Sequence, residues 1–160
     1  TTFKNPNQAL RNQSHSISTW DIPKQYRCPH IPGRVYYLHY LAELLSSTNA
    51  GAVLQSESVK GLDIGVGANT IYPLIGNHEY GWHFVGVDID AIALKNAQHI
   101  VNTNMLSNII ELRLQTSPDS YFKGVIKQGE TCDFTICNTP IHAYLADAQA
   151  GTKRTWRGTR

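Results

Sequence analysis

The feature that most constrains the fold of this 160-residue chain is a predicted strand that ends in two closely spaced glycines. The strand covers residues 59–64; Gly65 follows it directly, and Gly67 is two positions further on. Glycine lets the chain turn sharply there and lets a ligand approach the backbone. Asp88 stands 23 residues after Gly65, at the end of a second apolar run. A carboxylate there can accept hydrogen bonds from both hydroxyls of a ribose, so the pattern predicts a nucleoside-cofactor site.

Strand and helix patterns alternate along the chain. We expect four strands, at residues 59–64, 83–87, 110–114 and 132–136. We also expect three helices: one that begins at Arg34, one over residues 70–77, and one capped by Asp90 with a buried stripe of Ala93, Ala97, Ile100 and Val101. This alternation predicts an α/β fold with a mostly parallel, right-handed sheet that binds ligands at the carboxyl ends of its strands.

Composition excludes several classes of protein. The 41% hydrophobic content is ordinary for a globular chain, and 160 residues suit one domain. No apolar run approaches the roughly 20 residues that cross a bilayer, and no signal peptide is recognisable at the start. The cysteines (Cys28, Cys132 and Cys137) are odd in number and lack the spacing of a zinc site, as do His78 and His83. We therefore expect a cytoplasmic protein that has no metal and no membrane segment.

The two ends of the chain differ from its centre. Residues 1–33 are polar and rich in proline, so we expect an N-terminal arm anchored by Trp20 and Ile22, followed by a globular domain over residues 34–160. Residues 1–34 carry five Lys or Arg against one acid, the last nine carry four against none, and the stretch between carries five against eleven. Basic ends around an acidic centre are typical of a protein that binds a polyanion such as RNA. The alternative is that these charges only keep the ends soluble.

Two loops indicate which class of reaction the predicted site could catalyse. Gly65-Val66-Gly67-Ala68-Asn69-Thr70 lacks the third glycine with which dehydrogenases pack helix on strand. After the fourth strand, Asn138-Thr139-Pro140-Ile141 offers a side-chain amide oxygen and a main-chain oxygen to the two hydrogens of a planar amine. Such acceptors increase the nucleophilicity of an amino nitrogen on an aromatic ring, whose lone pair is otherwise donated to the ring. A nucleoside cofactor beside a planar amine predicts methyl transfer.

The Asn-Thr-Pro-Ile segment resembles the Asn/Asp-Pro-Pro-aromatic tetrad of adenine-N6 methyltransferases. Residues 20–23, 32–34, 71–76 and 80–82 are similar to the ribosomal RNA large subunit methyltransferase F family, and the resemblance covers most of residues 18–157. It implies a Rossmann-like class I methyltransferase that uses S-adenosylmethionine to methylate N6 of one adenine in 23S ribosomal RNA. The fold of that family continues beyond the tetrad, so we expect this domain to be incomplete at its C-terminus.

The sequence departs from the tetrad of that family at two positions. Thr139 replaces a proline, and Ile141 replaces the aromatic residue that stacks on the flipped base. Base stacking is worth roughly 1 to 3 kcal/mol, so we expect impaired transfer unless Tyr144 or Trp156 supplies a ring. Two other functions stay open: a catalytically silent RNA-binding module that retains the cofactor pocket, and methylation of a glutamine side chain in a protein.

The remaining candidate residues each have an ordinary structural alternative. The resemblance assigns the cofactor's carboxylate to Arg34, which could instead be a solvated arginine at a helix start. Asp63 is a candidate for the cofactor's amino group, through water, or for a strand-end cap. The predicted cofactor-binding set is Arg34, Asp63, Gly65, Gly67, Asn69, Asp88 and Gln115, with Gln115 contacting adenine. The predicted RNA-binding set is Lys153, Arg154 and Arg157, which would grip phosphates, and Trp156, which would stack on a base; a disordered tail is the alternative.

Overall fold

The structure, a computed structural model of the chain, describes residues 17, 20–23, 26, 29–53, 55–117 and 119–138. The helices and strands run in the order α2 (Ile31–Ser47), β1 (Lys60–Ile64), α3 (Ile71–Tyr80), β2 (His83–Asp88), α4 (Ala91–Thr103), β3 (Ile110–Leu114) and β4 (Phe134–Cys137). They alternate along the described residues up to β3, and β4 follows β3 without a helix between them. None of the described helices is long and apolar enough to span a bilayer.

The strands form one sheet in the order β3-β2-β1-β4. All three pairings are parallel, with Leu62 opposite Val85 and Ile64 opposite Cys137. The carboxyl ends of the four strands therefore lie along one edge. This arrangement confirms the predicted parallel α/β sheet.

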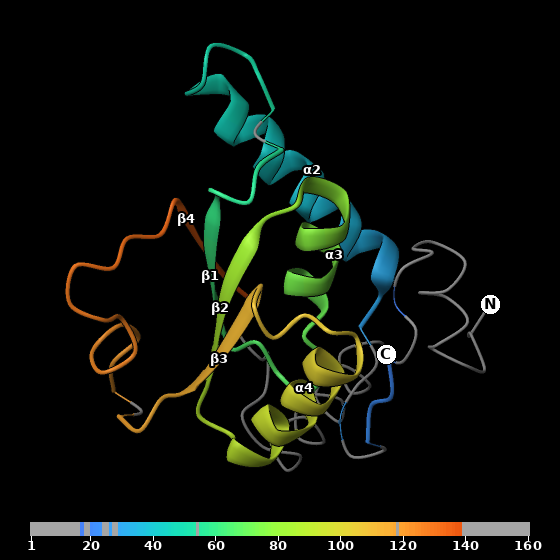
Figure 1. Ribbon diagram of the computed structural model, residues 1–160, viewed down its shortest axis with the longest axis vertical. Helices are drawn as coiled ribbons and strands as arrows, with labels where there is room; N and C mark the ends of the chain where they lie inside the picture. The colour runs from blue at the N-terminus through green and yellow to red at the C-terminus, as the bar shows by residue number, and fades with distance from the viewer. Residues whose placement is uncertain are drawn as a thin grey trace, which may run out of the picture.

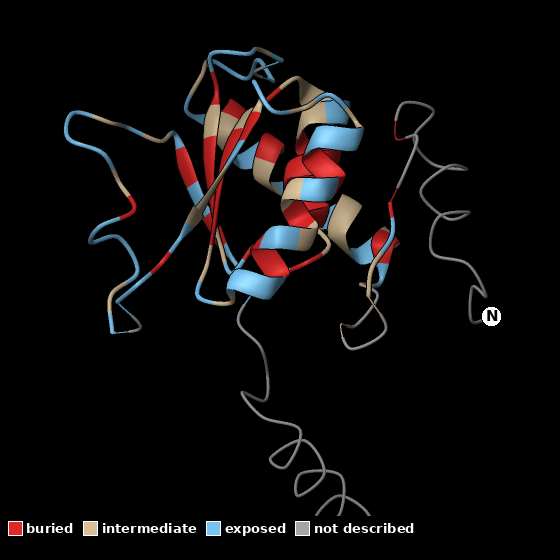
Figure 2. Cartoon of the chain, turned by 60° about the horizontal axis from the view of Figure 1, so that its bottom comes forward, coloured by how far each residue is buried: buried red, intermediate tan, exposed pale blue. Residues whose placement is uncertain are grey.

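The two faces of the sheet are covered differently. Helices α2, α3 and α4 lie on one face, and the segment between β3 and β4 crosses the other as an irregular loop (Figure 1). The larger core cluster lies under the helices and includes Trp20, Leu38, Trp82, Phe84 and Ile136. A smaller cluster of Leu62, Val85, Val87 and Val125 lies under the loop. Figure 2 shows buried residues concentrated on the strands and on the sheet-facing sides of the helices.

The first described helix begins earlier than the sequence predicts. Helix α2 starts at Ile31 rather than at Arg34. The His30 side chain caps it by accepting a hydrogen bond from the Gly33 N–H at 3.3 Å. Pro32 lies in the first turn, where the missing N–H costs nothing. Pro32, one of the prolines from which an extended arm up to residue 33 was predicted, thus lies in the first turn of helix α2.

Charged side chains hold the irregular loop on the sheet. The Arg113 guanidinium on β3 donates to the Glu130 carboxylate at 2.6 and 2.8 Å and to Glu111 at 2.7 Å. Glu130 also pairs with Lys60 of β1, and its side chain is only 9% exposed. These partners lower the pKa of Glu130 well below its usual range, with Arg113 the largest cause. On this face a partly buried ion-pair cluster, rather than a helix, holds the chain against the sheet.

Candidate functional site

The predicted cofactor loop lies at the carboxyl edge of the sheet. Gly65 and Gly67 follow β1 with φ of 79° and 66°, a left-handed conformation that side chains disfavour. No described residue comes within 4 Å of the position that a Cβ on Gly65 would occupy. The loop is therefore open on the side where a ligand would approach.

Asp88, at the end of β2, holds the loop in place. One carboxylate oxygen accepts the Gly67 N–H at 2.8 Å, and the other accepts the Asp90 N–H at 2.9 Å. Each oxygen retains a second acceptor position. The structure thus brings together Gly65, Gly67 and Asp88, which the sequence assigned to one site.

Asp63 is the most unusual titratable group at this edge. It is 1% exposed, and its Oδ2 has no hydrogen-bond partner among the described residues. The pKa of Asp63 is raised to about 8, chiefly by burial and also by the negative charge of Asp88, while the nearby Arg34 opposes the rise. A buried carboxyl group without a partner is costly, so it identifies a place where a cationic or hydrogen-donating ligand group would be stabilised.

Arg34 lies near Asp63 but is hydrogen-bonded elsewhere. Its guanidinium donates to the Tyr72 hydroxyl at 2.7 Å and lies 5.4 Å from the centre of the Tyr72 ring. Tyr37 packs against the same ring, with 5.4 Å between centroids. These contacts leave most of the five N–H donors of Arg34 available for an anion.

Thr70 belongs to the same region, although the sequence does not predict it as a site residue. Its side chain is fully buried, and Oγ1 has no hydrogen-bond partner among the described residues. It precedes α3 in a left-handed conformation, φ 53°, and does not cap the helix with its side chain. Asn69 caps instead, since its Oδ1 accepts the Ile71 N–H at 3.0 Å. A threonine before a helix has the pattern of an ordinary N-cap, so nothing in the sequence indicates that its hydroxyl is buried without a partner.

Gln115 follows β3 and is engaged within its own loop. Both of its amide hydrogens are donated, to Ser120 O at 2.7 Å and Lys123 O at 3.1 Å, and Oε1 accepts the Ser117 N–H at 2.8 Å. One acceptor position on Oε1 remains. Any bond from this side chain to an adenine must therefore accept the adenine amino group.

Asn138 directly follows β4 and is exposed. The register of β4 on β1 places Cys137 opposite Ile64, so Asn138 lies at the same edge as the glycine loop. The other tetrad residues, Thr139, Pro140 and Ile141, lie outside the described residues, as do the predicted RNA-binding Lys153, Arg154, Trp156 and Arg157.

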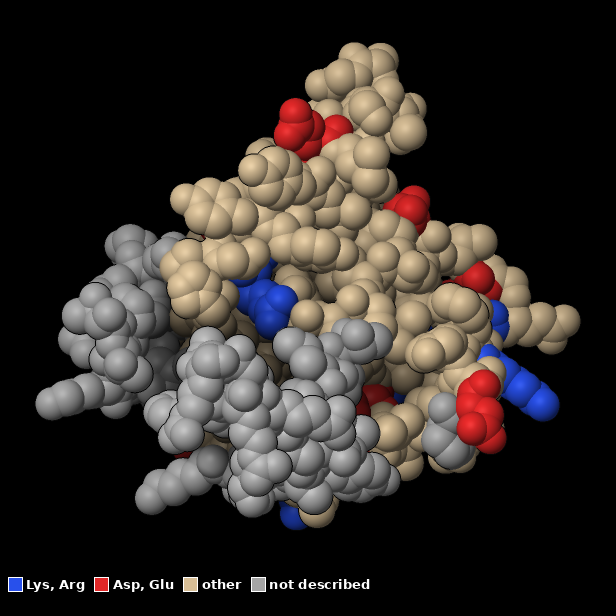
Figure 3. Space-filling model, turned by 180° about the vertical axis from the view of Figure 1, so that it is seen from behind, with Lys and Arg blue, Asp and Glu red and all other residues tan. Residues whose placement is uncertain are grey.

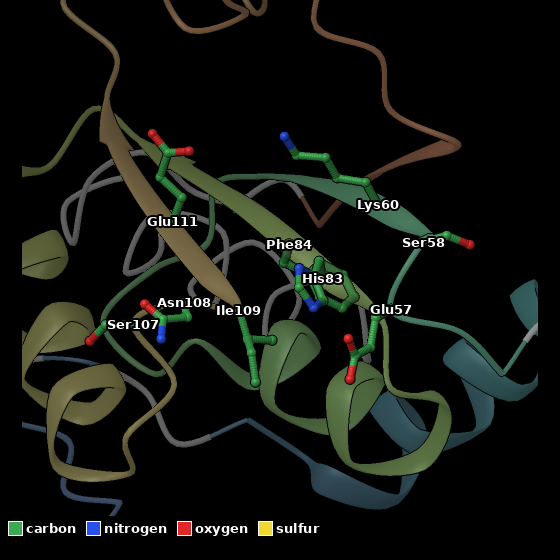
Figure 4. Close-up of a pocket in the computed structure, with 9 residues that line it drawn as sticks. All are labelled: Glu57, Ser58, Lys60, His83, Phe84, Ser107, Asn108, Ile109 and Glu111. Atoms are coloured by element: carbon green, nitrogen blue, oxygen red, sulfur yellow. The ribbon is translucent and has the colours of Figure 1, made fainter.

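A hollow of about 340 Å³ opens at the opposite edge of the sheet (Figure 4). Its lining comes from the starts of β1, β2 and β3 and from the preceding turns, and includes Lys60, His83 and Glu111. Lys60 is paired with Glu130, and Glu111 with Arg113 and Lys127. Parallel α/β sheets bind ligands at the carboxyl ends of their strands, so we assign the functional site to the glycine-loop edge.

The face shown in Figure 3 has no further candidate site for a polyanion, and the described residues have none for a metal ion. Figure 3 shows Lys and Arg side chains scattered on the visible face rather than gathered in a patch. Of the basic residues predicted at the two ends, only Arg34 is among the described residues. No group of three or more His, Cys, Asp or Glu among them could hold a metal ion.

Comparison with known proteins identifies the family. Residues 1–160 match a family described as RNA methyltransferase. The ribosomal RNA large subunit methyltransferase F of Stutzerimonas stutzeri is 50% identical over 161 residues, which cover 97% of this chain and 49% of that protein. The chain thus spans about half the length of the curated relatives it matches.

Two solved structures have the same fold. The N-terminal domain of human METTL16 in complex with SAH aligns with a TM-score of 0.72 and 27% identity, covering 99% of this chain and 63% of that one. The hMettl16 catalytic domain in complex with MAT2A 3'UTR hairpin 6 aligns with a TM-score of 0.70 and 27% identity, covering 94% and 50%. Since the family match extends over its whole length, the chain belongs to the RNA methyltransferase family.

Proposed function

We propose that this chain forms the donor-binding part of an S-adenosylmethionine-dependent methyltransferase that modifies N6 of an adenine in 23S ribosomal RNA. The observation that carries the proposal is the unpartnered carboxyl oxygen of Asp63, buried beside Arg34 and Asp88 at the glycine-loop edge. The 50% identity to a ribosomal RNA methyltransferase supports the substrate class. An rRNA substrate implies action in the cytoplasm.

The residues at this edge fit the chemical groups of S-adenosylmethionine. The orphaned Asp63 oxygen suits the ammonium of the methionine part, directly or through a water molecule, and the Arg34 guanidinium suits its carboxylate. The open, left-handed turn at Gly65 admits the donor close to the backbone. Asp88 retains acceptor positions for two ribose hydroxyls, and Asn69 and Gln115 complete the proposed set.

The residues that follow β4 would position the methyl acceptor beside the donor. When bound, the cofactor supplies an electrophilic methyl group on a sulfonium. Asn138 accepts one hydrogen of the adenine amine, the main-chain oxygen of Thr139 accepts the other, and Pro140 and Ile141 complete the acceptor segment. These acceptors weaken donation of the nitrogen lone pair into the ring and align it with the methyl group. No strong general base is required before attack.

Calorimetric titration with S-adenosylhomocysteine (SAH) tests the donor site. Arg34→Gln removes the proposed carboxylate partner, and we expect SAH binding about 10- to 100-fold weaker, as for loss of charge-assisted hydrogen bonds. Tyr72→Phe is the matched control, because it removes the hydroxyl that Arg34 contacts but keeps the guanidinium. Absence of SAH binding by the wild-type chain would refute the donor-site proposal.

The altered tetrad favours a second candidate, an RNA-binding module without methyl transfer. Thr139 and Ile141 stand where the resembled family has proline and an aromatic ring. Single-turnover transfer of labelled methyl to unmodified 23S rRNA separates the two functions, since a silent module would retain RNA without incorporating label. We expect Ile141→Phe combined with Thr139→Pro to raise the single-turnover rate about tenfold or more. No gain would refute our account of the tetrad.

A further inference from the structure

Residues of the N-terminal arm contact the proposed cofactor loop directly. Trp20 is 1% exposed and lies in the core cluster under the helices. Its indole N–H donates to the main-chain oxygen of Asn69 at 2.7 Å. A residue of the arm thus fixes the orientation of a peptide group in the loop.

A second contact joins the arm, the loop and helix α4. The Asn96 side-chain amide donates to Ala68 O at 2.8 Å and to Asp21 O at 3.1 Å. Two consecutive loop carbonyls, those of Ala68 and Asn69, are therefore held by side chains from outside the loop.

A third contact reaches the loop through the turn after β2. The Tyr26 hydroxyl donates to Asp90 Oδ2 at 2.7 Å. The Asp90 N–H donates to Asp88, whose other carboxylate oxygen holds the Gly67 N–H. The arm therefore contacts both strand-end turns that border the site.

The backbone of the loop explains why such contacts matter. Gly65, Gly67 and Thr70 all have positive φ, of 79°, 66° and 53°. For Thr70 this conformation is unfavourable, and it persists only where surrounding contacts impose it. The hydrogen bonds to Ala68 and Asn69 lie between two of these left-handed residues.

We infer that Trp20 and Tyr26 are positioning residues of the cofactor site, and that docking of the arm and binding of the nucleoside cofactor are coupled. The inference rests on the proposed function, because it takes the glycine loop as the donor-binding loop. Coupling is reciprocal: the docked arm increases affinity for the cofactor, and the bound cofactor stabilises the docked arm.

Trp20→Phe and Tyr26→Phe test the inference, because each removes one hydrogen-bond donor and keeps a ring. We expect each to weaken SAH binding, measured by calorimetry, about three- to tenfold, the range for one hydrogen bond that acts on binding. We also expect SAH to slow amide hydrogen exchange in residues 20–26 of the wild-type chain. The two substitutions should reduce that protection.

Trp82→Phe and Tyr80→Phe are the matched controls. Trp82 belongs to the same core cluster and Tyr80 packs against it, but Tyr80 is the last residue of α3 and Trp82 lies just before β2. We expect them to lower the melting temperature and leave the Kd for SAH within twofold. If the arm variants lose stability yet bind SAH like wild type, the arm only fills the core and the inference is wrong. A wild-type chain that fails to bind SAH would instead overturn the proposed function, and the inference with it.

Discussion

At the scale of single residues, the buried Asp63 carboxyl group makes the stability of the fold depend on pH. Its carboxyl group is buried without a partner for Oδ2, and burial raises its pKa to about 8 from 3.8. Between these two values the unfolded chain has released the proton that the folded chain keeps. Stability must therefore fall as the pH rises from about 4 to about 8.

We predict that Asp63→Asn stabilises the free protein. The amide has the same shape as the carboxyl group but does not ionise. The gain in melting temperature should be small at pH 5 and larger at pH 8. The same substitution should weaken SAH binding about tenfold or more, because the ammonium loses its charged partner.

Thermal unfolding at the two pH values, with calorimetry at pH 7, checks this prediction. Asp119→Asn, in the exposed part of the β3–β4 loop, is the control and should change neither quantity. If Asp63→Asn had a lower melting temperature than the wild type at pH 8, the carboxylate would already have hydrogen-bond partners in the free protein.

Thr70 gives a second prediction at this scale. Thr70→Val keeps the shape of a buried side chain and removes a hydroxyl that has no described partner. We expect the free protein to gain about 1 kcal/mol in unfolding free energy, since an unsatisfied buried polar group costs about 1–3 kcal/mol. Urea unfolding measures the change. A loss of stability would mean that the hydroxyl is hydrogen-bonded in solution, for instance to a buried water.

The sequence could predict some of these residues and not others. Gly65, Gly67 and Asp88 stand at strand ends, where spacing alone places them together. Thr70 could not be predicted in this way, because only the structure shows that its hydroxyl is buried without a partner among the described residues and that its φ is positive. Gln115 was predicted at the correct edge, but only the structure shows that both of its amide hydrogens are donated within its own loop.

At the scale of secondary-structure elements, helix α3 packs so closely on the sheet that a glycine is required. A Cβ on Gly76 would lie 2.5 Å from the ring of Phe84, which is 1% exposed. We predict that Gly76→Ala destabilises the protein by about 1–3 kcal/mol, although alanine favours a helix by about 1 kcal/mol. Chemical denaturation provides the measurement.

Gly33→Ala in helix α2 is the matched control. Its new Cβ would meet its nearest neighbour, His30 Nδ1, at 3.4 Å, an ordinary contact. We expect no loss of stability and a gain of up to about 1 kcal/mol. Equal effects of the two substitutions would contradict the close packing of α3 on Phe84.

Because of the ion-pair cluster on the other face, the free energy of unfolding depends on pH in the acid range. Its hydrogen bonds lower the pKa of Glu130 below the usual 4.5, and Arg113 and Lys127 lower that of Glu111 to about 2. The stabilisation is complete above about pH 4.5 and is lost as the pH falls toward 2. We predict that Glu130→Gln costs about 1.5–3 kcal/mol at pH 6 and less at pH 3.

Urea unfolding at both pH values measures this difference. Glu57→Gln, at an exposed position before β1, should have little effect at either pH. An equal cost of Glu130→Gln at pH 6 and pH 3 would show that the cluster does not depend on the ionised carboxylate.

The elements were more predictable than the contacts between them. Periodicity placed all four strands and found Asp90 as the cap of α4, where its side chain accepts the Ile92 and Ala93 N–H groups. The start of α2 was missed because Pro32 and Gly33 read as a break, whereas Pro32 lies in the first turn. The irregular cover of the second face depends on ion pairs distant in sequence, Lys60 with Glu130 and Arg113 with Glu130.

At the scale of the whole molecule, the site combines contributions from distant segments. The arm supplies Trp20, α2 supplies Arg34, and β1, β2 and β4 end at the same edge. A ligand bound there stabilises all of these segments together. We predict that SAH at about a hundredfold excess over its Kd stabilises the fold by about 2.7 kcal/mol.

For a chain of this size such a gain raises the melting temperature by roughly 5–10 °C. Differential scanning fluorimetry with increasing SAH provides the test. Arg34→Gln should show a smaller rise at the same SAH concentration. An equal rise in both would place the ligand away from Arg34.

The position of β4 beside β1 has a consequence for biosynthesis. Asp133 and Lys60 exchange hydrogen bonds of 2.8 and 2.7 Å where these two strands begin, although more than seventy positions of chain separate them. A ribosome releases β1, β2 and β3 with their helices before β4. The nascent polypeptide can therefore form the edge that carries Gly65, Gly67 and Asp88 first, and Asn138 reaches this edge only when β4 pairs with β1.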